Sequence, residues 1–165
     1  MPSTDAAQLR RHSLRMARLT FFLFAGTFLA VVVPTLIGFA LTPARGLPPA
    51  LAFAAVLWMP VPFYLYALWA IRGAFLGFAA GGSLGSAIAT GCMRAGVALA
   101  IGGALSAIGV PNVMRLLLAR GGPVIIDIAY LAVAAIGLAL ILVGRLLAEA
   151  QPDPVRLEEG PDGAP

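Results

Sequence analysis

A carboxylate is the side chain in this sequence that could most directly move an ion or a proton inside a membrane. Asp127 is the one acid within a long apolar stretch, and ionisable groups at such places mark ion or proton paths. The alternative role is structural, because residues 121–123 read Gly-Gly-Pro and place Asp127 near the start of a helix and near the membrane surface. Arg115 or Arg120 could then pair with it across the loop. We favour the structural role, since one acid does not make a proton relay.

Other catalytic chemistry lacks the necessary residues. His12 is the only histidine, so neither a multi-histidine metal site nor a Ser-His-Asp triad can be built. Cys92 is the only cysteine and has no histidine or acid near it in the sequence, as is usual for an inert thiol. No Gly-Lys-Ser/Thr sequence forms a phosphate loop, and no basic folded face serves nucleic acid. We therefore predict a protein that is not an enzyme and has no cofactor, metal or nucleic-acid partner.

Two prolines interrupt one apolar stretch near its middle. Pro60 and Pro62 each lack a backbone donor and crowd the carbonyl four residues earlier, those of Val56 and Trp58. Helices broken at mid-membrane build substrate sites in many transporters. Such transporters usually carry a matching break in a repeated half, and this sequence has no internal repeat. A packed kink is the favoured interpretation, and a transport site is the alternative.

Small residues recur at four-residue spacing, the pattern that lets membrane helices approach closely. The two series are Gly73, Gly77, Gly81 and Gly85, and Ala98, Gly102 and Ser106. The second series predicts tight packing against another helix, either of the same chain or of a second copy.

The elements that position these residues must be surrounded by lipid. Charged residues make up 11% of the chain and hydrophobic residues 61%, against about 25% and 45–50% in soluble domains. A chain of 165 residues could not cover so much apolar surface in water. We predict one all-α integral membrane domain whose first partner is the lipid bilayer.

Four apolar runs reach the length of about 20 residues that a membrane-spanning helix needs. They cover residues 19–42, 46–71, 95–114 and 124–144, after a basic tail at 1–18 and before a disordered tail at 151–165. Residues 73–93 carry no charge but contain six glycines, which disfavour a helix. We predict that this segment is a glycine-rich cytoplasmic connection along the membrane surface, and a fifth span is the alternative.

The arginines predict the orientation through the positive-inside rule. Four spans with the N-terminus inside place eight of the eleven arginines in the cytoplasm, whereas five spans place seven there. Four spans and cytoplasmic termini are therefore preferred. Tyr66 and Trp69 lie close to Arg72, where an interfacial aromatic belt is expected. The absence of lysine, with abundant alanine, glycine and proline, is typical of a GC-rich bacterial genome.

The middle of the chain also carries a recognisable pattern of apolar, glycine and basic positions. Residues 65–96 read LYALWAIRGAFLGFAAGGSLGSAIATGCMRAG. The marked positions are Phe75, Gly81 or Gly82, Arg94 and Gly96. This pattern resembles the bacterial membrane proteins catalogued as domain of unknown function 2975, and GRLLAEA at 144–150 is similar to the end of their last span. Leu84 stands where the family usually has phenylalanine, and the tail after residue 150 lacks the usual ending.

The resemblance implies a four-helix inner-membrane protein with both ends in the cytoplasm and no established activity. Family members often neighbour small helix-turn-helix regulators, so a cytoplasmic regulator is a partner implied by association. From the residues and the resemblance together, we predict a non-enzymatic protein that acts through structural or regulatory interactions with itself or another membrane protein. A small transporter or channel subunit using the kinked second span is the alternative.

Overall fold

The computed structural model describes residues 3–41, 47–119 and 122–150, which contain helices and no strand. The elements are α1 (Ser3–Leu41), α2 (Leu47–Trp58), α3 (Val61–Ala79), α4 (Leu84–Ala104), the π-helical turn η2 (Leu105–Gly109), α5 (Val110–Leu117) and α6 (Ile128–Glu149). The segment expected as a basic tail, 1–18, is helical from Ser3 and continues without interruption into the first apolar run. The tail expected at 151–165 lies outside the described residues.

Four helical units are long and apolar enough to cross a membrane, as predicted. They are Arg11–Leu41, Ala50–Ala79, Leu84–Leu117 and Ile128–Glu149. The second unit contains both α2 and α3, and the third contains α4, η2 and α5. The described residues contain no fifth unit of this kind.

The structure corrects the prediction for residues 73–93. Residues 73–79 complete α3 and residues 84–93 open α4, so only residues 80–83 form the connection. Gly81 has φ +105°, a conformation that glycine adopts readily, and the hydroxyl of Ser83 accepts the N–H of Ser86 to cap α4. The segment is helical despite its glycines because α3 and α4 pack against each other, with Gly91 facing Ala74.

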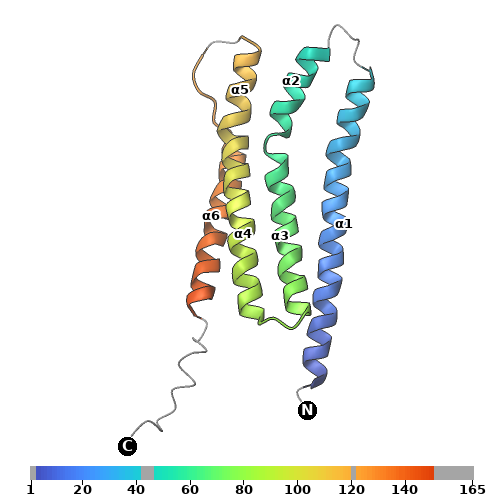
Figure 1. Ribbon diagram of the computed structural model, residues 1–165. Coiled ribbons are helices and arrows are strands. Elements are labelled where there is room, and N and C mark those ends of the chain that lie inside the picture. The colour runs from blue at the N-terminus through green and yellow to red at the C-terminus, as the bar shows by residue number, and fades with distance from the viewer. Residues whose placement is uncertain (1–2, 42–46, 120–121, 151–165) are drawn as a thin grey trace, which may run out of the picture.

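The helices run up and down side by side (Figure 1). The first residues of α1, the α3–α4 turn and the last residues of α6 lie at one end of the bundle (Figure 1). We call it the basic end, because most arginines of the described helices lie toward it. These are Arg11, Arg15, Arg18, Arg72, Arg94 and Arg145. Arg115, near the last residue of α5, lies toward the opposite end. That the basic end faces the cytoplasm stays a prediction of the positive-inside rule.

The core between α3 and α4 is built from small side chains. Ala67 and Ala70 of α3 and Ala95 and Ala98 of α4 form a buried cluster. No large side chain among the described residues is completely buried. Van der Waals contact between closely spaced helices therefore stabilises this part of the bundle.

The contact between α4 and α6 is closer still and depends on glycine. Gly96 and Gly103 of α4, seven residues apart, face Gly137 and its neighbours on α6. A Cβ atom added to Gly103 would lie 2.6 Å from the backbone nitrogen of Ala134, and one added to Gly96 would lie 2.6 Å from the carbonyl oxygen of Gly137. The two backbones thus touch directly, as in the tightest membrane helix pairs.

Helix α1 packs against α3, but its most apolar part is less buried than those of the other membrane-crossing units. No residue in its most apolar window is buried, whereas 28% of the corresponding window of the third unit is buried. Its contact with α3 includes Phe24 against Trp69, with ring centroids 5.9 Å apart, and Phe21 beneath the guanidinium of Arg72. The bundle thus combines an α4–α6 pair in backbone contact with a first helix that packs on α3.

Candidate functional site

Three interruptions of regular helix lie at one level of the bundle, in the half away from the basic end. They are the break at residues 59–60 between α2 and α3, the π-helical turn η2, and the non-helical residues 124–127 before α6. The hydroxyls of Tyr64, in the first turn of α3, and Ser106, in η2, are 2.9 Å apart and hydrogen-bonded. The N–H of Asp127 donates to the carbonyl of Ala107, also in η2. We call this level the break layer.

The break between α2 and α3 falls where the prolines predicted it. Helix α2 ends at Trp58 and α3 begins at Val61, with Pro60 as its N-cap and Pro62 in its first turn. The carbonyl of Val56, for which Pro60 has no N–H, accepts the N–H of Met59 at 3.2 Å. The backbone group freed by the proline is therefore paired within the protein, as membrane burial requires.

A further proline, Pro111, accounts for the connection between η2 and the start of α6. Pro111 has no N–H to offer the carbonyl of Ala107 four residues earlier, and this carbonyl accepts the N–H of Asp127 at 2.9 Å. The neighbouring Asn112 donates from Nδ2 to the carbonyls of Ile108, at 2.6 Å, and Ile125, at 2.8 Å. Its Oδ1 accepts the N–H of Ile125 at 3.1 Å.

The side chain of Asn112 thus supplies hydrogen bonds to the backbone of η2, at Ile108, and of the segment before α6, at Ile125. Sequence reasoning did not single out Asn112. The available signal was an amide next to a proline within a long apolar run.

Asp127 has the structural position that sequence reasoning favoured, the N-terminus of a helix. It is the N-cap of α6, and its Oδ1 accepts the N–H of Ala129 at 3.0 Å. The predicted fourth span over 124–144 therefore needs correction, since its helix begins at Ile128. The pairing with Arg115 does not form, because that guanidinium donates to the carbonyl of Pro123. Arg120 lies outside the described residues.

Asp127 lies some distance along the bundle from Arg115. It is level with Ala107, which precedes Arg115 by eight residues. That separation is roughly 12 Å along the helix axis. The Asp127 side chain is exposed on the outside of the helices. Within the described part of the chain it is the one acid at the break layer.

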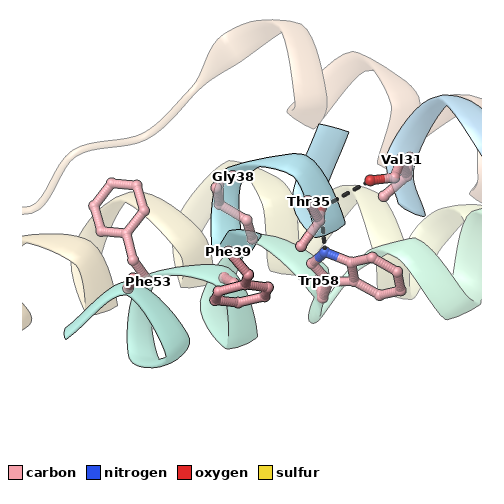
Figure 2. A pocket seen from close by; sticks show the side chains of 9 residues that line it. Val31, Thr35, Gly38, Phe39, Phe53 and Trp58 are labelled. Carbon is pink, nitrogen blue, oxygen red and sulfur yellow. Dashed lines mark hydrogen bonds between the residues drawn. The ribbon is translucent and has the colours of Figure 1, made fainter. Parts of the chain in front are cut away.

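On the side of the break layer away from the basic end, an apolar cleft lies between α1 and α2. We call it the α1–α2 cleft. Its volume is about 550 Å³. Its walls are formed by Val31, Thr35, Gly38, Phe39, Ala50, Phe53, Ala54, Leu57 and Trp58. Figure 2 shows Trp58 donating from its indole nitrogen to the hydroxyl of Thr35, at 3.1 Å, which in turn donates to the carbonyl of Val31, at 2.8 Å. This short chain of hydrogen bonds joins the two helices and is the polar part of an otherwise apolar wall.

The small residues singled out in the sequence have different roles. Gly102 meets α3 of the same chain, since an added Cβ would lie 3.1 Å from the Cβ of Phe63. Gly81 forms the α3–α4 turn. Around Gly77 there is open space, with nothing within 4 Å of an added Cβ.

The glycines that bring helices into backbone contact were not recognised from the sequence. They are Gly96, Gly103, Gly137 and Gly144. Their seven-residue spacing within each helix was the available signal, but only the structure shows that the two pairs face each other.

The polar side chains of the break layer are engaged in structural hydrogen bonds. Every buried side-chain nitrogen or oxygen in the described part has a partner. The described residues contain no group of three side chains able to hold a metal ion. The arrangement therefore offers an apolar cleft and one exposed carboxylate, rather than a set of convergent polar groups.

Comparisons with protein families, with curated proteins and with solved structures gave no match.

Proposed function

We propose that this chain is a non-enzymatic, multi-pass protein of the bacterial inner membrane that acts through structural or regulatory contacts within the bilayer. The contact surface in this proposal is the half of α1 away from the basic end, together with the α1–α2 cleft. The observation that carries it is the contrast between the backbone contact of α4 with α6 and the open cleft between α1 and α2.

The other surfaces are less suited to this role. The small-residue series containing Gly102 is occupied by α3 of the same chain. The α4–α6 glycines are likewise covered by each other. The α1–α2 cleft is apolar and includes the exposed Phe53. A transmembrane helix of a second membrane protein, or of a second copy, is the partner that such a wall accommodates.

Site-specific crosslinking in native membranes tests this proposal. A photo-reactive phenylalanine analogue would replace Phe53 in the cleft, and the same analogue would replace Leu142, exposed on α6, as the control. We expect a discrete crosslinked band from position 53 and none from position 142. Co-expression of two differently tagged copies distinguishes self-association from a second protein. Equal, diffuse labelling at both positions would contradict the proposal.

Transport is the alternative, and the break layer is the observation that favours it. Interrupted helices at one depth, with an exposed carboxylate beside them, are features that transporters use at substrate sites. Asp127→Asn is the discriminating change, because asparagine also caps helices well. A transport phenotype that disappears with Asp127→Asn at unchanged membrane levels would favour transport over the interaction role.

A cytoplasmic regulator is a further proposed partner, and it rests on the family resemblance alone. If the basic end faces the cytoplasm, such a regulator would meet the α3–α4 turn. Co-purification with wild type and with a variant carrying Ser83→Glu in that turn would test it, with loss of the regulator in the variant as the expected result.

A further inference from the structure

A second cavity lies between α3 and α4 at the basic end, away from the break layer. Its volume is about 330 Å³. We call it the α3–α4 groove. The residues that define its character are Tyr66, Trp69, Gly73, Gly77, Thr90 and Arg94, with Ser83 and Ser86 beside the turn. It is the more polar of the two grooves discussed here, and its chemistry differs from that of the α1–α2 cleft.

The floor of the groove is open because of two glycines. Gly73 and Gly77, one turn apart on α3, have nothing within 4 Å of an added Cβ. This is the opposite of Gly91 on α4, where an added Cβ would lie 2.6 Å from the Cβ of Ala74. The regular glycine spacing on α3 therefore does not serve helix contact. It leaves space that none of the described residues fills.

The wall on α4 is lined by hydrogen-bond donors and a cation. Ser86, Thr90 and Arg94 follow one another at four-residue spacing and so share a helix face. Among the described residues, the guanidinium of Arg94 and the hydroxyls of Ser86 and Thr90 have no hydrogen-bond or ion-pair partner. None of the described residues that line the groove is acidic. The groove thus carries a positive charge and free donors.

The aromatic residues of the groove favour a position at the boundary of a bilayer. Tyr66 and Trp69 lie at the end of the groove farthest from the α3–α4 turn, and such aromatics concentrate where hydrocarbon meets headgroups. Trp69 is held in place by the Arg72 guanidinium, 4.7 Å from its ring centroid. The unit that contains Arg94, Leu84–Leu117, has 34 residues and a length of roughly 51 Å. It exceeds the hydrocarbon thickness of about 30 Å, so an end of it extends into the headgroup region.

We propose that the α3–α4 groove binds the phosphate headgroup of an anionic phospholipid. An arginine at the edge of the hydrocarbon is costly without a counter-charge, and a phosphate supplies that charge while accepting paired hydrogen bonds from the guanidinium. The hydroxyls of Ser86 and Thr90 are within the same groove to donate to the remaining oxygens. Basic pockets between membrane helices are known to hold anionic headgroups. This binding is independent of the contact surface proposed above at the α1–α2 cleft.

Native mass spectrometry of the purified full chain tests this assignment. Phosphatidylglycerol is the anionic probe, and phosphatidylcholine is the neutral comparison. We expect the wild type to retain phosphatidylglycerol with about fivefold preference, since one arginine near the surface favours an anionic lipid by about that factor. Arg94→Gln should abolish most of this preference. Arg145→Gln, which removes a basic-end arginine outside the groove, should leave it unchanged.

A second pair of variants fills the groove without changing charge. Gly77→Leu places a side chain in the open floor and should lower phosphatidylglycerol retention as much as Arg94→Gln does. Gly26→Leu is the matched control, because Gly26 on α1 also has nothing within 4 Å of an added Cβ. Equal losses with Arg94→Gln and Arg145→Gln would overturn the proposal by pointing to diffuse surface charge. Displacement of the lipid by inorganic phosphate would overturn the lipid assignment in favour of a soluble anion.

Discussion

The backbone N–H of Asp127 donates to the carbonyl oxygen of Ala107 at 2.9 Å, across a separation of twenty residues in the chain. The bond uses the carbonyl for which Pro111 has no N–H, and it sets the level at which α6 begins. The π-helical turn, the non-helical residues 124–127 and the N-terminus of α6 are therefore one structural unit. A substitution that destabilises one of these elements should therefore destabilise the others.

Asn112→Ala should lower the free energy of unfolding by about 1–3 kcal/mol. The substitution removes the side-chain bonds to Ile108 and Ile125, and it leaves backbone groups without partners in a setting where water does not replace them. Thermal unfolding in detergent measures the change. Leu142→Ala, at a side chain exposed on α6 away from this loop, is the control. An unfolding temperature that Asn112→Ala leaves unchanged would show that the loop does not depend on this amide.

Asp127→Ala should destabilise the protein by about 1 kcal/mol, because the N-cap of α6 loses its acceptor for the N–H of Ala129. Asp127→Asn retains a capping oxygen and should cost only a few tenths of that amount. Parallel unfolding measurements on the two variants check the difference. Equal losses would mean that the charge of Asp127, rather than its capping bond, stabilises the protein.

Gly103→Val should disrupt the α4–α6 pair and cost at least about 1–3 kcal/mol. An added Cβ there lies 2.6 Å from the nitrogen of Ala134 and 2.9 Å from the carbonyl oxygen of Tyr130, and backbone atoms cannot move aside as a flexible side chain can. Membrane levels and the fraction surviving heating in detergent report the effect. Gly26→Val, at an open position on α1, should remain close to wild type.

Gly77→Ala should have the opposite effect and raise the free energy of unfolding by about 0.5–1 kcal/mol. The position is helical and open on its outer side, so alanine gains helix propensity without a steric cost. An increase in unfolding temperature is the expected observation. A decrease would show that the glycine at this position packs against a partner.

Thr35 and Trp58 should be energetically coupled, because their hydrogen bond is the polar link between α1 and α2. A double-mutant cycle with Thr35→Val and Trp58→Phe should yield a coupling of about 0.6 kcal/mol, as is typical of hydrogen bonds between membrane helices. Unfolding of the four proteins in the same detergent provides the measurement. Strict additivity would mean that the indole and hydroxyl bond to other groups in the membrane.

Features that depend on local chemistry were predictable from the sequence. The apolar runs predicted four membrane-crossing units because burial of a helix in lipid depends on its own length and composition. Pro60 and Pro62 predicted the break in the second unit because a missing N–H acts on the same helix. The capping role of Asp127 followed from the same local reasoning.

The prediction for residues 73–93 was wrong because it counted glycines without knowing what lay opposite them. Glycine disfavours an isolated helix, but packing against a neighbouring helix supplies most helical stability in proteins. Gly91 lies against Ala74, and this contact between α3 and α4 accompanies helical structure on both sides of the turn. Helical spacing likewise could not separate Gly77, which lines an open groove, from Gly103, which touches α6.

The sequence by itself thus determined that the chain forms helices able to cross a membrane, roughly where these helices lie, and where one of them breaks. The tertiary structure alone decided which glycines touch, that Ala107 pairs with Asp127, and that Arg94 faces a groove whose described lining residues include no acid. The physical reason is the same in each case. Hydrophobicity and backbone hydrogen bonding within a helix are properties of neighbouring residues, whereas the partner of a helix face is set by segments far away in the chain.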